Sequence, residues 1–149
     1  MSKRLVVSSL VGAAAAVAGA LVFATSADAA APAEPTISKA AARYTTSTAG
    51  ASLTFTATVA DNSGVKSLKV LAWPASSGLA PTADEMKAVE DAKCKATSTT
   101  TSVCTYTAKS SARESAALPE GTWYVSALAT AKDHGTTFEP KATTFTLKH

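Results

Sequence analysis

The feature of this sequence that most limits its possible folds is the alternation of apolar and polar side chains in several short segments. Residues 53–59 alternate Leu, Phe, Ala and Val with Thr, and residues 122–131 alternate in a similar way. Successive side chains of a strand point to opposite faces, so a period of two predicts half-buried β-strands. In the second segment Trp123, Val125 and Ala127 share one side, and we expect Trp123 to be a core residue.

Further segments carry strand patterns, and turn residues separate them. The expected strands are residues 36–44, 65–73 and 143–147, together with a hairpin formed by residues 93–97 and 102–109. Turns are expected at residues 61–64 and 133–135, which carry Asp and Gly, and at residues 118–121, which carry Pro and Gly. Short strands at intervals of about ten residues predict a single mainly β domain, a β-sandwich over residues 36–149.

One segment between strands carries a helix signal. Thr82 and Glu85 stand three positions apart, as the N-cap and N3 residues of a capping box do. We therefore expect one short inserted helix of about three turns, residues 82–92. Its apolar side is formed by Met86, Val89 and Ala92.

The N-terminal residues have the layout of a secretory signal peptide. Lys3 and Arg4 precede an uncharged stretch rich in Ala, Val and Leu over residues 5–24. Ala27 and Ala29 are small residues at the positions that a signal peptidase accepts for a cut after Ala29. We expect Sec-type export and a secreted protein.

A retained membrane anchor is the alternative, since a run of about twenty uncharged residues is long enough to span a bilayer. The run is mostly Ala, Gly and Val, which favours cleavage. Removal of the signal peptide, residues 1–29, leaves a flexible leader over residues 30–35 and one domain, with no membrane span.

The two cysteines, Cys94 and Cys104, both follow the signal peptide. An isolated pair in an oxidising compartment is expected to form a disulfide. Their spacing matches no metal-binding finger. We expect a structural disulfide across the hairpin.

Charge and motif content exclude several classes of function. The chain has 14 basic and 11 acidic residues, a net charge of +3, and no run of like charge, so nucleic acid is not an expected partner. Its two histidines are His134, in an expected turn, and His149, the last residue. They suggest no Ser/His/Asp or Cys/His set, and the sequence has no phosphate loop or HExxH motif. We expect no enzyme and no cofactor.

Two stretches resemble bacterial immunoglobulin-like domains. The pattern Leu118-x-x-Gly121-x-Trp123-x-Val125-x-Ala127-x-Ala129, followed by Asp133-x-Gly135, is similar to their penultimate strand and last turn. The pattern Asp61-x-Ser63-Gly64-Val65-x-Ser67-Leu68-x-Val70 resembles their turn from the second to the third strand. The resemblance implies an immunoglobulin-like sandwich and no particular function.

The chain departs from that family in two respects. Trp123 stands where the corner tyrosine often stands, and the cysteines are not on the two strands that antibody domains bridge. As a whole, the chain also resembles small secreted actinobacterial proteins of a domain of unknown function. That resemblance implies export and a β-rich fold, and no activity.

The immunoglobulin order would bring two turns to the same end of the sandwich and suggests a calcium site. Asp61, Asn62 and Asp133 could then offer oxygen ligands, of which Ca²⁺ takes six to eight. Asp and Asn are also common turn formers for local backbone reasons. Three ligands are few, so we favour the turn role and expect no metal.

A patch of aromatic and apolar side chains is the better candidate for a binding site. Leu71, Trp73, Tyr124 and Leu128 would share the outer face of one sheet. Either the inserted helix covers this face, or the four residues form a platform for an extracellular protein or glycan. We favour the helix cover, because the helix needs a surface on which to bury its apolar side.

The function expected from these observations is a non-catalytic binding or interaction module, a monomer that acts at the cell envelope or outside the cell. The alternative is a secreted protease inhibitor that presents an exposed loop. The loops at residues 75–80 and 96–102 are candidates, although neither carries an obvious anchoring side chain.

Overall fold

The structure is a computed structural model that describes residues 32–149. The expected signal peptide, its cleavage after Ala29, and the leader's first residues, 30 and 31, lie outside the described residues. Among residues 32–149, no helix is long and apolar enough to cross a membrane.

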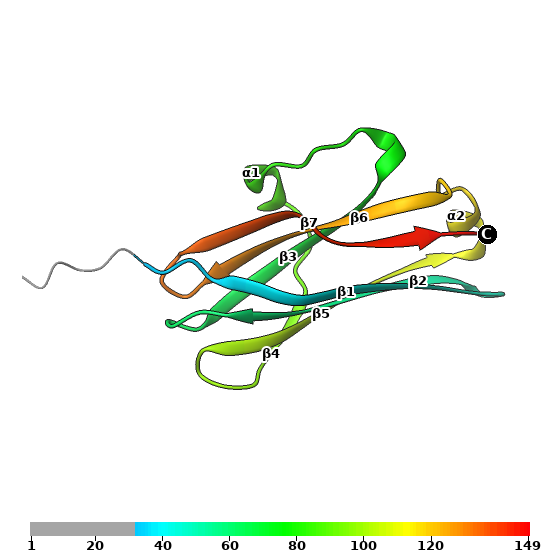
Figure 1. Cartoon of the computed structure of the whole chain (residues 1–149). Helices are drawn as coiled ribbons and strands as arrows, with labels where there is room; N and C mark the ends of the chain where they lie inside the picture. Colours follow the sequence, from blue (N-terminus) through cyan, green and yellow to red (C-terminus); the bar gives the residue numbers. More distant parts are fainter. Residues whose placement is uncertain (1–31) are drawn as a thin grey trace, which may run out of the picture. The chain divides into compact units, whose positions relative to one another are not determined.

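Two antiparallel sheets form the domain (Figure 1). The larger sheet has the strand order β1-β2-β5-β4 and the smaller one the order β3-β6-β7. The strands of the larger sheet are β1 (Thr36–Ser47), β2 (Gly50–Ala60), β4 (Lys93–Ala96) and β5 (Thr101–Ser111). Those of the smaller sheet are β3 (Val65–Pro74), β6 (Gly121–Ala131) and β7 (Thr136–Leu147). This strand order is that of constant-type immunoglobulin domains. The expected mainly β sandwich is confirmed.

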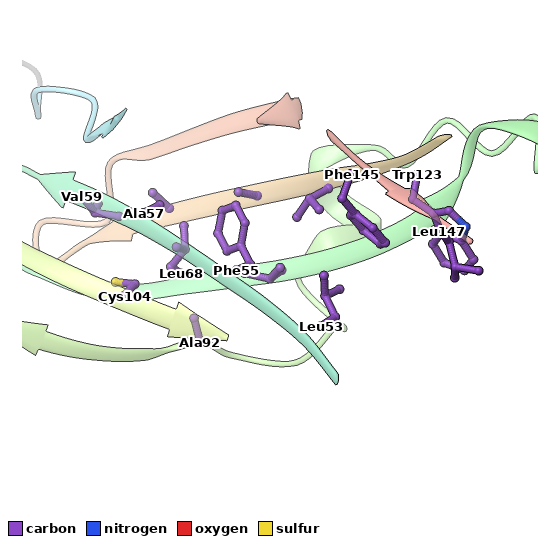
Figure 2. Packing of buried hydrophobic residues seen from close by; sticks show 14 residues of the cluster. Leu53, Phe55, Ala57, Val59, Leu68, Ala92, Cys104, Trp123, Phe145 and Leu147 are labelled. Carbon is purple, nitrogen blue, oxygen red and sulfur yellow. The ribbon is translucent and has the colours of Figure 1, made fainter. Parts of the chain in front are cut away.

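The core lies between the sheets and follows the alternation in the sequence. Phe55 and Val59 of β2 are fully buried, as are Leu68 of β3 and Val125 of β6. Figure 2 shows Phe55, Val59 and Leu68 along the sandwich, with Trp123 grouped beside Phe145 and Leu147 at one end. Trp123 is 9 % exposed and belongs to the core cluster, as its position on the alternating strand predicts.

The expected disulfide is present. Cys94 and Cys104 lie directly opposite each other on β4 and β5 and are bonded. Cys104 is fully buried in the core, whereas Cys94 is exposed. The bond therefore fastens the short strand β4 to the long strand β5.

The inserted helix is much shorter than the three turns expected over residues 82–92. Helix α1 covers Ala83–Met86, and its predicted capping box between Thr82 and Glu85 is present. The helix ends early because the chain then pairs with the edge of β3. The Val70 N–H donates to the Glu90 carbonyl at 3.1 Å, and the Ala92 N–H donates to the Leu68 carbonyl at 2.7 Å. Ala92 consequently packs in the main core and not in a helical stripe.

Three further features were not expected from the sequence. A short 3-10 helix, η1 (Ala75–Ser77), follows β3, and α2 (Ala112–Ala116) follows β5 with a capping box of its own. Strand β7 begins at Thr136 and not at residue 143, because it pairs with β6 on both sides of an irregularity in register.

The expected flexible leader, residues 30–35, is fixed at its last residue. Pro35 is fully buried, and its carbonyl accepts a hydrogen bond from the Thr137 hydroxyl. Residues 32–34 are exposed and have no regular structure. The domain therefore begins one residue earlier than the sequence pattern indicates.

Candidate functional site: a cavity at one end of the sandwich

An apolar cavity of about 210 Å³ lies where β5 leads into α2. Its walls come from both sheets and include Tyr44, Leu53, Leu71, Tyr106, Ala108 and Trp123. We call it the end cavity. Ligand pockets are concave and mostly apolar with a few polar groups, which is the character of this lining.

Three aromatic rings form one wall of the end cavity. Phe145 stacks between Tyr44 and Trp123, with ring centroids 5.8 Å from each neighbour. The Trp123 indole N–H donates to the Pro119 carbonyl at 2.9 Å. The stacking and this hydrogen bond hold the wall in one arrangement, so the cavity is already formed without a ligand.

Tyr44 also gives the cavity lining a buried polar atom. Its hydroxyl is shielded from solvent, and among residues 32–149 it has no hydrogen-bond partner. Buried polar groups in native proteins usually have a partner, because leaving one unpaired costs about 1–3 kcal/mol. This hydroxyl could donate to or accept from a polar atom of a bound molecule.

A second tyrosine of the lining is held by an acidic residue. The Tyr106 hydroxyl donates to Glu90 Oε2 at 2.9 Å. Burial, followed by the hydrogen bond to the Glu90 carboxylate and its charge, raises the pKa of Tyr106 to about 12. Tyr106 is therefore neutral at physiological pH and is fixed beside the segment that follows α1.

The edge of strand β5 lies beside the end cavity. Strand β4 pairs with β5 only as far as Lys93, which is opposite Thr105. From Tyr106 to Ser111, β5 pairs with β2 alone. A second hollow, of about 450 Å³, borders this edge, and its lining includes Lys93, Thr105 and Thr107.

Of the two alternatives for the face that carries Trp73 and Leu128, the structure agrees with the one that the sequence favours, a cover by the inserted helix and not an exposed platform. Trp73 is 6 % exposed and Leu128 is 3 % exposed. The two lie on the outer face of the smaller sheet, on the side where Figure 1 shows the loop that carries α1. Met86 of α1 is fully buried, which agrees with a helix that covers this face.

The other two platform residues are half-buried. Tyr124 packs against Trp73 with ring centroids 4.8 Å apart, and Lys141 Nζ lies 4.2 Å from the Tyr124 ring centroid. Leu71 lines the end cavity. The four side chains therefore do not form one exposed surface.

The calcium candidates lie in neighbouring turns, as the immunoglobulin order implies. The Asp133 N–H donates to the Ser63 hydroxyl at 3.2 Å, and that hydroxyl donates to Asp61 Oδ1 at 2.6 Å. Each carboxylate also accepts a backbone N–H of its own turn, from Ser63 and Gly135. Asn62 is exposed. Residues 32–149 contain no group of three or more His, Cys, Asp or Glu side chains that could hold a metal ion.

The end cavity could not be found from sequence patterns. Its walls combine side chains of β1, β2, β3, β5, β6 and β7, which only the folded topology brings together. The helix α2 beside the cavity could have been predicted from the sequence, because Ser111 and Glu114 form the same kind of capping box as Thr82 and Glu85.

Comparison with known proteins finds a family match. Residues 37–129, more than half of the chain, match a family of unknown function (DUF5707). No curated protein and no solved structure matches the chain.

Proposed function

The chain belongs to the DUF5707 family, whose function is unknown, so we propose a role from the end cavity: this is an exported, non-catalytic binding module. The observation that carries the proposal is a pre-formed apolar cavity with a rigid aromatic wall and a buried tyrosine hydroxyl. Aromatic side chains supply large contact areas at low entropic cost, which suits them to recognition.

Export is the second part of the proposal. It is supported by the signal-like residues 1–29 and by the Cys94–Cys104 bond, since disulfides persist in oxidising compartments. N-terminal sequencing of the protein from culture medium tests it, with Ala30 as the expected first residue. A protein that stays with the cells and keeps residues 1–29 would contradict export.

Binding through the end cavity can be tested with one filled variant and one matched control. Ala108 lines the cavity, so Ala108→Leu adds a side chain inside it. Ala41 is exposed on β1, so Ala41→Leu makes the same change outside the cavity. Each immobilised protein is incubated with purified cell wall and, separately, with secreted proteins of the producing cells.

The expected result is retention of a protein or glycan by the wild type and by Ala41→Leu, and a loss of about tenfold or more with Ala108→Leu. Equal retention by all three proteins would show that binding does not use the end cavity. Gel filtration of the same samples tests the expectation of a monomer.

A second candidate function is protease inhibition, and one observation favours it. Leu79 is 46 % exposed in the loop after η1, and residues 76–80 are all exposed. An exposed Leu could enter the specificity pocket of a serine protease. Incubation with subtilisin-like and chymotrypsin-like proteases tests this, with Leu79→Ala as the variant and Ser76→Ala as the control. Rapid cleavage after Leu79 without inhibition would exclude it.

A further inference from the structure

We propose that the ligand of the end cavity is an extended peptide segment, which adds as a strand to the free edge of β5 and places an apolar side chain in the cavity. This inference rests on the proposed function and names the class of its partner. Strand addition to an exposed sheet edge uses main-chain hydrogen bonds for affinity and side-chain pockets for specificity. The structure has both features side by side.

The backbone groups available at this edge can be identified from hydrogen bonds elsewhere on β5. The Thr101 carbonyl accepts from the Thr97 N–H at 2.9 Å, on the β4 side. The Thr100 carbonyl accepts from the Asp61 N–H at 2.8 Å, on the β2 side. Because these directions alternate along an antiparallel strand, odd-numbered residues of β5 turn their N–H and C=O groups towards β4.

Thr107 and Lys109 therefore direct their backbone groups to the side where β4 has ended. Among residues 32–149, no segment pairs with them there, since β4 reaches only to the partner of Thr105. An added strand would continue the line of β4 along β5. It would find two N–H donors and two C=O acceptors at Thr107 and Lys109.

Side-chain directions connect this edge to the end cavity. Tyr106 and Ala108 are partly buried and line the cavity, and they alternate with Thr107 and Lys109, which are exposed; Lys109 also borders the cavity. Residues directly opposite each other in a sheet share a face. A partner residue opposite Ala108 would therefore point its side chain towards the cavity, whose volume of about 210 Å³ exceeds the 150 Å³ or so that holds a benzene molecule.

Charges along the edge favour a partner with acidic residues on its outer side. Residues 32–149 contain two ion pairs, Lys69–Asp91 and Lys87–Asp84, and neither uses Lys93 or Lys109. The nearby Glu90 carboxylate accepts the Tyr106 hydroxyl. The partner that fits this edge is an extended segment with apolar residues at alternate positions and Asp or Glu between them.

The test uses the protein purified from culture medium and a displayed library of random decapeptides. We expect selection of peptides with that alternating pattern. Thr107→Pro removes the free N–H at an edge position, where proline is tolerated, and should weaken binding of a selected peptide by about tenfold. Thr107→Val keeps the N–H and the β-branched shape and should bind as the wild type does.

Amide hydrogen exchange gives a readout that does not depend on how the proline variant folds. In the free protein, the Thr107 and Lys109 amides should exchange quickly and the Tyr106 and Ala108 amides slowly, and a bound peptide should protect the first pair. Slow exchange of Thr107 and Lys109 in the free monomer would overturn the inference, as would selection of no peptide. Protection that appears with rising protein concentration alone would also overturn it, because the occupant would then be a second copy of this chain.

The Ala108→Leu variant separates this inference from the proposed function. If Ala108→Leu abolishes binding and Thr107→Pro leaves it unchanged, the cavity binds a ligand without strand pairing, so the function stands and the strand inference fails. If neither substitution changes binding, both fail.

Discussion

Trp73 donates its indole N–H to the hydroxyl of Ser126 at 2.9 Å, and Ser126 in turn donates to the Pro140 carbonyl at 2.7 Å. The relay joins β3, β6 and β7 on the outer face of the smaller sheet. Ser126 lies where the β6–β7 register shifts, between Val125 and Ala127. Its hydroxyl therefore donates to the carbonyl of Pro140, a residue that is not paired with β6 in the register.

Replacing the centre of this relay should destabilise the domain. Ser126 is fully buried, so Ser126→Ala leaves the Trp73 indole N–H and the Pro140 carbonyl without this partner. We expect the free energy of unfolding to fall by about 1–3 kcal/mol, measured by urea denaturation. Ser67→Ala on β3 is the control and should change it by less than about 0.5 kcal/mol. Equal effects of the two substitutions would show that the relay contributes nothing.

Both tryptophans should resist a neutral fluorescence quencher. Trp73 and Trp123 are each less than one-tenth exposed, so acrylamide should quench the native protein far less than the urea-unfolded chain. A quenchable fraction near one half would mean that one indole is open to solvent. With Trp123 in the core, that result would restore the exposed face at Trp73 as a candidate binding surface.

Reduction of the Cys94–Cys104 bond should weaken the domain without unfolding it. The bond closes a loop with a sequence separation of 10, for which the chain-entropy estimate gives a stabilisation of about 2.5–3 kcal/mol. We expect a lower urea midpoint and an unchanged β-rich circular dichroism spectrum, because most of the core lies on other strands. Alkylation of two thiols before any reduction, detected by intact mass, would contradict the bond.

The strands could be predicted from sequence because each inward face repeats every two residues. Phe55 on β2 and Val125 on β6 show this period, and both are fully buried. The place of Trp73 on the outer face also followed from this period, whereas the helix cover over it was only the favoured one of two alternatives. Its cover depends on where the loop after β3 returns, which is a long-range property of the chain.

The start of α1 could be predicted from the sequence, whereas its length could not. The capping box at Thr82 correctly marked the start of the helix, since a cap is a local interaction. Its end is set by the hydrogen bonds of Glu90 and Ala92 with β3, some twenty residues earlier in the chain. The end cavity was missed for a similar reason, because its walls meet only after both sheets have formed.

Tyr106 should give the domain a stability that disappears at alkaline pH. Its pKa is about 12 in the folded protein, raised first by burial and then by the hydrogen bond and charge of Glu90, against about 10 in an unfolded chain. The unfolded chain therefore loses this proton first. The contribution is complete below pH 10 and is lost as the pH rises from about 10 to 12. Phenolate absorbance, compared between the wild type and Tyr106→Phe, isolates this titration.

Glu90→Gln should move the Tyr106 pKa part of the way back towards 10, because burial remains after the charge is removed. Identical titration curves for the wild type and Glu90→Gln would show that the Glu90 carboxylate does not accept the hydrogen bond of the Tyr106 hydroxyl.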